Sequence, residues 1–227
     1  MPRKKPYDDG CATAHALDLF GERWALLIIR ELIPGPQRFS DLKAALPGIS
    51  SNILTVRLGE LERSYIAVRR QLPPPAPAMV YELTEWGAEL EPIIKSIGKW
   101  AAKSPTMAQG MPMSAASVML SFRTMFDADR AAGLDLNFDL ILDRRAHSVS
   151  VSNGELTIEP NQLANAKTTV AGNPDLVAGV VYGGLSLDDA QQAGLAIQGD
   201  PAMFEAFARL FPLPAKAEGS KGSNARH

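Results

Sequence analysis

Residues 47–64, with the sequence PGISSNILTVRLGELERS, contain the pattern on which the fold assignment depends. The proline–glycine pair breaks any helix before it, and Ser50 can cap a new helix by accepting a backbone N–H. Three leucines then recur at helical spacing and form one apolar stripe, made of Leu54, Leu58 and Leu61. The stretch therefore predicts a helix over residues 51–64 with a buried apolar side and a polar side.

The segments before this helix also alternate between helical spacing and helix-breaking residues. Residues 12–20 are short and apolar, and residues 22–32 place apolar side chains at helical spacing. The sequence Pro34-Gly35-Pro36 must end the second of these helices, and a third, short helix opens at Phe39 or Ser40. We therefore expect three helices before the proline–glycine pair.

The segments after this helix predict a β-hairpin and a long helix. Residues 66–72 and 79–83 are strand candidates joined by a stiff, proline-rich loop. Thr84 can cap a helix that runs to about Ala102, and Pro92 should kink it. Two helices joined by a tight turn and followed by a hairpin form the winged helix-turn-helix plan.

This plan points to DNA as a partner. A helix about 10–12 Å wide fits the major groove, where Asn52 can pair bidentately with adenine and Arg57 with guanine or a phosphate. Nearby basic residues can neutralise phosphates, and the proline-rich loop can lie along the neighbouring minor groove. The candidate DNA-binding residues are Arg38, Ser40, Lys43, Ser51, Asn52, Thr55, Arg57, Arg69 and Arg70. Alternatively, Arg57 pairs with Glu60 three residues on, and Asn52 and Thr55 are ordinary surface residues.

From Cys11 to Trp100, the chain resembles transcriptional regulators of the HxlR type. The resemblance implies a dimeric winged-helix DNA binder, often one that senses stress or small molecules. Two positions depart from the family pattern: Gly59 stands where a longer, often basic residue is usual, and Ala78-Met79 where the wing usually has an arginine. The matching pieces, in the family's order, are Cys11-Ala12, residues 17–24, residues 38–42, residues 46–50, residues 53–58 and residues 81–87.

The second half of the chain predicts a mixed domain of strands and helices. Asn153-Gly154 supplies the positive φ of a tight hairpin turn between residues 148–152 and 155–159. Helix starts are expected after Asn173, Ser186 and Asp200, each a good capping residue. The remaining expected elements are a helix over residues 114–130 and strands over residues 134–142, 168–171 and 195–197.

The order of these elements over residues 115–212 resembles the sterol carrier protein-like lipid-binding domain. The most specific match runs from Leu185 to Phe211. The resemblance implies a sheet with helices around an apolar cavity that can take a small apolar ligand. The implied lining is Phe122, Phe126, Phe138, Phe204, Phe207 and Phe211. Alternatively, these phenylalanines simply fill a core, as buried aromatic residues normally do.

Composition and charge support two domains of an α+β protein. Hydrophobic residues make up 46% and charged residues 21% of the 227 residues, which excludes a disordered chain. Residues 1–105 carry 14 Lys and Arg against 12 Asp and Glu, whereas residues 106–227 carry 9 against 13. The expected divisions are a winged helix domain over residues 8–103, a linker over 104–114, a sterol carrier protein-like domain over 115–213 and a disordered tail over 214–227.

The sequence also excludes several classes of protein. It contains no signal peptide and no apolar run of 18 residues, so we expect a cytoplasmic protein that does not bind membranes. It contains no constellation of catalytic residues and no metal-ligand spacing, so we expect neither an enzyme nor a cofactor.

Two further expectations concern assembly and sensing. The apolar stripe of residues 90–100 exceeds what one small domain can cover, which predicts a homodimer. Cys11 matches a position that some relatives use as a redox sensor, although a lone cysteine is more often an inert apolar residue. A second hypothesis is a lipid-binding or carrier protein that uses its N-terminal half only for dimerisation.

Overall fold

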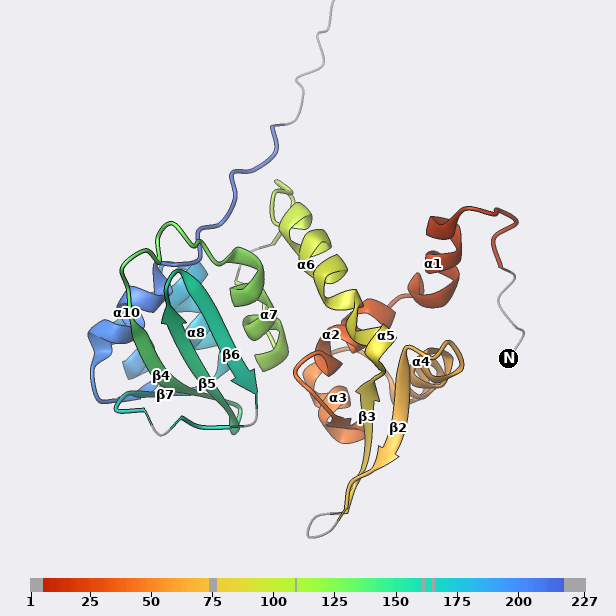
Figure 1. Ribbon diagram of the computed structural model, residues 1–227, viewed down its shortest axis with the longest axis horizontal. Coiled ribbons are helices and arrows are strands. Elements are labelled where there is room, and N and C mark those ends of the chain that lie inside the picture. Colours follow the sequence, from red (N-terminus) through yellow and green to blue (C-terminus); the bar gives the residue numbers. More distant parts are fainter. Residues whose placement is uncertain (1–5, 74–76, 109, 161, 165, 219–227) are drawn as a thin grey trace, which may run out of the picture. The chain divides into compact units, whose positions relative to one another are not determined.

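The computed structural model describes residues 6–73, 77–108, 110–160, 162–164 and 166–218. The chain divides into two compact units (Figure 1). The first unit runs to Ile94 and includes Ser114–Leu120, and the second comprises Lys95–Met113 and the residues from Ser121 on. Within the described ranges, no helix is both long and apolar enough to cross a bilayer.

The first unit has the predicted helix-turn-helix and hairpin. Its elements are α1 (Ala12–Phe20), α2 (Ala25–Leu32), β1 (Gln37–Arg38), α3 (Phe39–Ala45), α4 (Ser51–Arg63), β2 (Ala67–Gln71), β3 (Met79–Leu83), α5 (Glu85–Ala88) and the first turn of α6 (Leu90–Ala101), whose residues from Lys95 on belong to the second unit. The strands form an antiparallel sheet in the order β1-β3-β2. Strand β1 was not expected, because two residues are too short to show an alternating pattern.

The predicted cap of α4 and the leucine stripe are confirmed. Ser50 accepts the backbone N–H of Ile53 at 3.2 Å, which satisfies one of the unpaired donors at the start of the helix. The three leucines of α4 are buried in a core shared with α2 and α3. This packing fixes which side of α4 faces outward.

Two helix boundaries differ from the expectation for physical reasons. Helix α2 begins at Ala25 instead of residue 22, because Trp24 adopts a left-handed conformation with a φ of 80°. The helix expected after Thr84 is divided at Glu89. Pro92 lacks an N–H, and its ring would clash with the carbonyl of Ala88, which is the last residue of α5.

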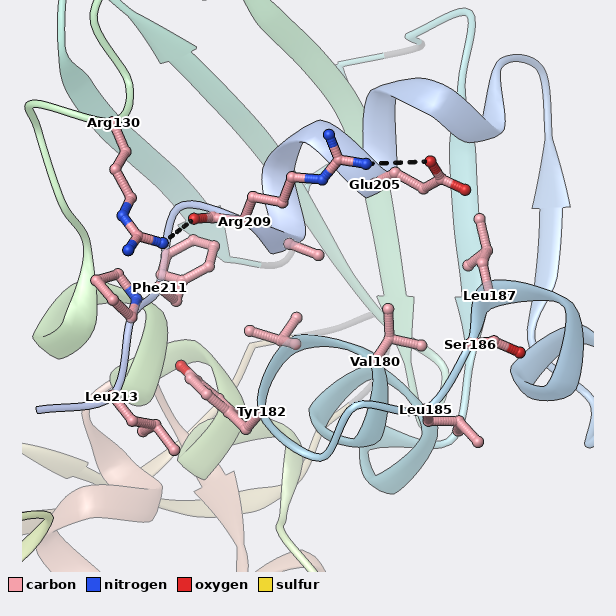
Figure 2. A pocket seen from close by; sticks show the side chains of 13 residues that line it. Arg130, Val180, Tyr182, Leu185, Ser186, Leu187, Glu205, Arg209, Phe211 and Leu213 are labelled. Atoms are coloured by element: carbon pink, nitrogen blue, oxygen red, sulfur yellow. Dashed lines mark hydrogen bonds and ion pairs between the residues drawn. The ribbon is translucent and has the colours of Figure 1, made fainter. Parts of the chain in front are cut away.

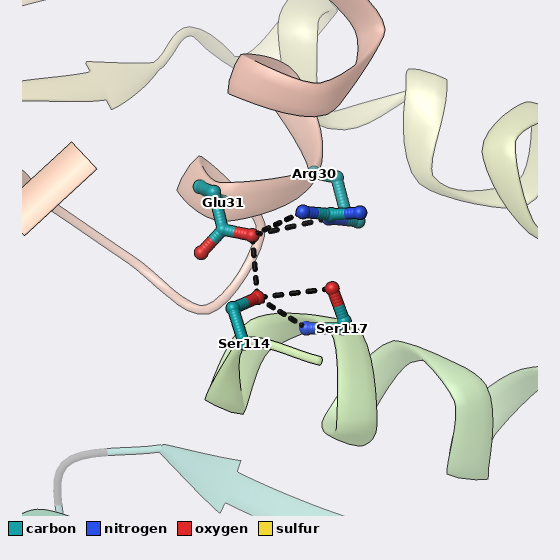
Figure 3. A network of polar contacts seen from close by, with 4 residues as sticks. All are labelled: Arg30, Glu31, Ser114 and Ser117. Carbon is teal, nitrogen blue, oxygen red and sulfur yellow. Dashed lines mark hydrogen bonds and ion pairs between the residues drawn. The ribbon is translucent and has the colours of Figure 1, made fainter. Parts of the chain in front are cut away.

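A buried carboxylate in the first unit accepts hydrogen bonds from two side chains (Figure 3). Glu31 is 1% exposed, and its Oε1 accepts from Arg30 Nη2 at 2.7 Å and from Ser114 Oγ at 2.6 Å. Ser114 Oγ in turn accepts the backbone N–H of Ser117 at the start of α7 (Ala115–Met125). These partners offset the cost of removing the charge from water.

The second unit is a five-stranded sheet with helices against it (Figure 1). Its further elements are β4 (Leu136–Leu142), β5 (Arg145–Ser152), β6 (Glu155–Pro160), β7 (Thr169–Gly172), α8 (Pro174–Tyr182), α9 (Leu187–Gln192), β8 (Ala196–Gln198) and α10 (Pro201–Ala208). The strand order is β6-β5-β4-β7-β8, with only the β4–β7 pair parallel.

The local signals of the second unit are confirmed almost throughout. Asn153 and Gly154 have φ values of 52° and 76°, as the predicted hairpin turn requires. The caps Asn173, Ser186 and Asp200 each accept a backbone N–H of the following helix. A second tight turn, at Asp143-Arg144, was not expected because neither residue favours positive φ as strongly as glycine.

The tail is partly described. Residues 214–218 form no helix or strand, but Lys216 and Ala217 donate hydrogen bonds to backbone carbonyls just after α6. The rest of the tail expected to be disordered, residues 219–227, lies outside the described residues.

Candidate nucleic-acid interface and pocket

Helix α4 presents a polar face to solvent. Ser51, Asn52 and Thr55 are exposed, while the leucine stripe anchors the opposite side. Thr55 Oγ1 donates to the carbonyl of Ser51 at 2.9 Å, so its hydroxyl is held along the helix. The amide of Asn52 therefore extends from the first turn of a rigid helix, where residues of a recognition helix contact base edges.

Arg57 is held by two carboxylates. Its Nη2 donates to Glu22 Oε2 at 2.9 Å, and its Nη1 pairs with Glu60 Oε2. The side chain is only 18% exposed. The alternative pairing with Glu60 is thus confirmed, and Arg57 also connects α4 to the turn between α1 and α2. Sequence reasoning missed Glu22, because a partner 35 residues away leaves no local signal.

Three of the other candidate DNA-binding residues lie on or next to α3. Arg38 and Ser40 are exposed at the start of α3, and Lys43 is half-buried on the same helix. Because none of these residues belongs to α4, we expect them to contact the DNA backbone and not the base edges.

The two wing arginines differ in their contacts. Arg70 forms two 2.6 Å hydrogen bonds with Glu82 across the hairpin, which lowers the pKa of that carboxyl and raises the pKa of Arg70. Arg69 is exposed on the same strand, and its side chain has no hydrogen bond or ion pair with any residue that the structure describes. The strand register could have identified Glu82, because Arg70 lies opposite Val80, two residues before it. The middle of the proline-rich loop, residues 74–76, lies outside the described residues.

Helix α6 carries an apolar surface of two parts. Leu90 and Ile94 pack against the core of the first unit. Ile93, Ile97 and Trp100 point outward and are 48%, 43% and 77% exposed. These three side chains form the outward stripe of α6, an apolar surface of the kind that marks a contact with another molecule.

Cys11 lies at the N-terminus of α1 and is exposed. Hydrogen bonding from the backbone of Thr13 lowers the pKa of the Cys11 thiol. A helix N-terminus favours negative charge for the same reason, because its N–H groups point at the sulfur. Cys11 is therefore exposed, and the pKa of its thiol is shifted in the direction that favours reactivity.

The second unit contains an open pocket of about 680 Å³ (Figure 2). It lies between the end of α8, the loop before α9, the end of α10 and residues 211–213. Its lining is mixed: apolar side chains from α8, α10 and residues 211–213 stand beside the charged side chains of Arg130, Glu205 and Arg209. Arg130 Nη1 donates to the carbonyl of Arg209 at 3.0 Å, and Arg209 pairs with Glu205 at 3.7 Å.

Most of the lining residues implied by the resemblance lie away from this pocket. Phe122, Phe138, Phe204 and Phe207 are fully buried and contact one another ring to ring, so they fill the core between the helices and the sheet. Phe126 contacts Phe211, and only Phe211 borders the pocket. The sequence did not identify Arg130 and Arg209, because the pocket joins segments that lie far apart in the chain.

A helix-turn-helix with an exposed polar second helix and a basic hairpin defines the winged-helix class of DNA-binding proteins. Residues 19–108 match the family described as HxlR-like helix-turn-helix, and the chain belongs to this family. Residues 101–217, just over half of the chain, match the family described as alkyl sulfatase C-terminal, and this part belongs to that family.

The relatives of the first unit are matched over most of their own length. The uncharacterized HTH-type transcriptional regulator YvaP of Bacillus subtilis is 41% identical over 88 residues, which are 39% of this chain and 82% of YvaP. The HTH-type transcriptional regulator YodB of the same organism is 40% identical over 86 residues, 38% of this chain and 77% of YodB. The solved reduced form of YodB is 36% identical, covers 42% of this chain and 95% of its own, and has a TM-score of 0.39.

Proposed function

We propose that this protein is a DNA-binding transcriptional regulator that places α4 in the major groove. The observation that carries the proposal is the exposed polar face of α4 on a helix-turn-helix whose relatives are named as transcriptional regulators. Asn52 would contact a base edge, with Ser51 and Thr55 beside it. Arg69, Arg38, Ser40 and Lys43 would contact the backbone, and Arg57 and Arg70 would support the interface through their carboxylate partners.

We propose that the regulator is a homodimer. The outward stripe of α6 is apolar and exposed, and a second copy of the same stripe is a chemically matched partner. Two α4 helices would then meet two half-sites about one DNA turn apart. Such a protein acts where the chromosome is, which in a bacterium is the cytoplasm.

The second unit would be a ligand-sensing domain of the sterol carrier protein-like kind. Its order of strands and helices supports this proposal, as does its open pocket, which is lined in part by apolar side chains. A small apolar ligand would act on DNA binding only by favouring one dimer geometry over another. Cys11 would be the redox-sensing residue of the first unit. Neither role requires a catalytic step.

The pocket also favours a second candidate function. A lipid-binding or carrier protein would need the pocket and would use the first unit only for dimerisation. The salt dependence of DNA binding separates the two functions, because each phosphate contact releases counterions and steepens the slope. A regulator shows a steep slope and prefers a specific site, whereas a carrier shows neither.

The test of the DNA-binding face compares two variants on the DNA upstream of the protein's own gene and on random DNA. We expect Asn52→Ala to lose about 1–3 kcal/mol on the specific site and little on random DNA, because it removes a base contact. Arg69→Ala should weaken both by a similar factor and reduce the salt slope by about one, as a phosphate contact does. Fluorescence anisotropy at several salt concentrations measures both effects. Equal losses for Asn52→Ala on the two DNAs would remove Asn52 from the base-reading set.

A further inference from the structure

The last described residues of the chain connect the pocket to the end of α6, and all of these parts belong to the second unit. At one end, Phe211 is held in the core by rings 4.7 Å away on Phe122 and Phe207. Phe211, Pro212 and Leu213 then form one wall of the pocket (Figure 2). The Leu213 side chain is 45% exposed, so no other part of the chain covers it fully.

At the other end, the same segment binds the C-terminal end of α6. Lys216 Nζ donates to the carbonyl of Ala102 at 3.0 Å, and the backbone N–H of Ala217 donates to the carbonyl of Lys103 at 2.7 Å. The last carbonyls of a helix have no partner within the helix, and a cation is favoured beside them. Lys216 and Ala217 thus satisfy groups that would otherwise be left to solvent.

The connection between the two ends is short and stiff. Only two residues separate Leu213 from Lys216, a span of about 10 Å at full extension. Pro212 and Pro214 flank Leu213, and each fixes its own φ. A change in the position of Leu213 is therefore passed to Lys216, because little slack in the chain can absorb it.

We propose that residues 211–217 form a strap that couples occupancy of the pocket to the order of the C-terminal end of α6. An apolar molecule in the pocket covers the exposed side of Leu213 and stabilises the strap in its observed position, which holds the two hydrogen bonds at the helix end. Without an occupant, the strap opens and the last turn of α6 frays. The strap is the means by which a ligand in the proposed site would regulate the protein. This inference rests on the proposed function, because α6 is the proposed dimerisation helix.

Coupling of this kind must be reciprocal. If an occupant of the pocket strengthens the bonds to the end of α6, then removing those bonds must weaken binding in the pocket by the same factor. Lys216 provides a clean test, because it does not line the pocket and its Nζ donates to the carbonyl of Ala102, directly after the last residue of α6. A change at Lys216 that alters binding in the pocket cannot arise from a lost ligand contact.

The test uses hydrogen exchange and probe titration on the full chain. Leu213→Ser should speed the exchange of Ala217 and of the amides of residues 98–104 several-fold, and Leu163→Ser, which changes a leucine that is 44% exposed in the same unit, should not. Saturation with the neutral fluorophore 1-aminoanthracene should slow exchange at the same amides, and Lys216→Met should weaken its binding several-fold. Lys216→Met leaves the core untouched, so a folding defect in Leu213→Ser does not obscure the result.

The proposal is overturned if Leu213→Ser and Lys216→Met leave exchange at residues 98–104 unchanged, or if Lys216→Met binds the fluorophore as well as the unaltered chain. Molecular mass and DNA affinity are measured on the same samples. A chain that is dimeric and binds DNA but shows no coupled exchange retains the proposed function and loses the strap. A chain that shows coupled exchange but does not bind DNA retains the strap and loses the proposed function.

Discussion

Burial and ion pairing determine whether a single side chain of this protein is available to DNA or is used within the fold. Asn52 and Arg57 lie on the same helix and both have groups that recognise bases, yet only Asn52 is exposed. Arg57 is held between Glu22 and Glu60, so its charge is already neutralised before any DNA arrives. Its Nε is buried without a partner, which indicates that the fold uses this arginine for its two Nη groups. The burial of its charged group therefore separates Arg57, which supports the fold, from Asn52, which we propose contacts DNA.

Cys11 allows a prediction about pH at the same scale. Because the pKa of its thiol is lowered in the fold, the thiolate forms at a lower pH than in the unfolded chain. We expect alkylation by iodoacetamide at neutral pH to be faster for the folded protein, with its pH midpoint below that of the same chain in urea. Cys11 is the single cysteine, so the rate reports on this residue alone.

The proposed sensing role of Cys11 is tested on the same samples. Peroxide should weaken DNA binding by the unaltered protein and leave Cys11→Ser unaffected. A folded midpoint at or above the unfolded one contradicts the lowered pKa, and a Cys11→Ser variant that responds like the unaltered protein contradicts the sensing role.

At the scale of elements, two glycines in helices predict opposite effects of the same substitution. A Cβ on Gly59 would meet only the end of the flexible Arg63 side chain, at 3.4 Å, so Gly59→Ala should stabilise the protein by about 0.5–1 kcal/mol. A Cβ on Gly87 would lie 2.0 Å from the carbonyl oxygen of Ile66, so Gly87→Ala should destabilise it by about 1–3 kcal/mol. Urea unfolding of both variants measures the two shifts. A stabilised Gly87→Ala would contradict the close approach of α5 to Ile66.

Most elements could be predicted from the sequence because their signals are local. A cap such as Ser50 or Asn173 and its first turn lie within four residues, and a hairpin turn such as Asn153-Gly154 lies within two. Strand β1 and the left-handed Trp24 could not be predicted, because both depend on neighbours that the chain reaches only after folding. The polar face of α4 was predictable because it follows from the spacing within one helix. The pairing of Glu22 with Arg57 was not, because the two residues lie 35 positions apart.

At the scale of the whole molecule, the pocket shows why a ligand site is harder to predict than a helix. Its walls come from segments around residues 130, 180–187 and 205–213, and no spacing in the sequence links them. The large phenylalanines attract attention as lining residues, but their rings pack against one another in the closed core, where they bury the most apolar area. The open pocket is lined instead by smaller apolar residues and by arginines, which are rarely buried in a core.

The assembly of two chains gives the last prediction, because the outward stripe of α6 is the proposed contact between copies. Ile97→Glu places a charge in the middle of that stripe, and burying an unpaired carboxylate in a dimer interface is costly. We expect a monomer by sedimentation equilibrium and a loss of DNA affinity on the order of a hundredfold, since a monomer can engage only one half-site at a time. Lys99→Glu is the matched control: it adds the same side chain two positions further on the same helix, away from the stripe. A dimer that survives Ile97→Glu, or one that Lys99→Glu dissociates equally well, would place the contact between copies on another surface.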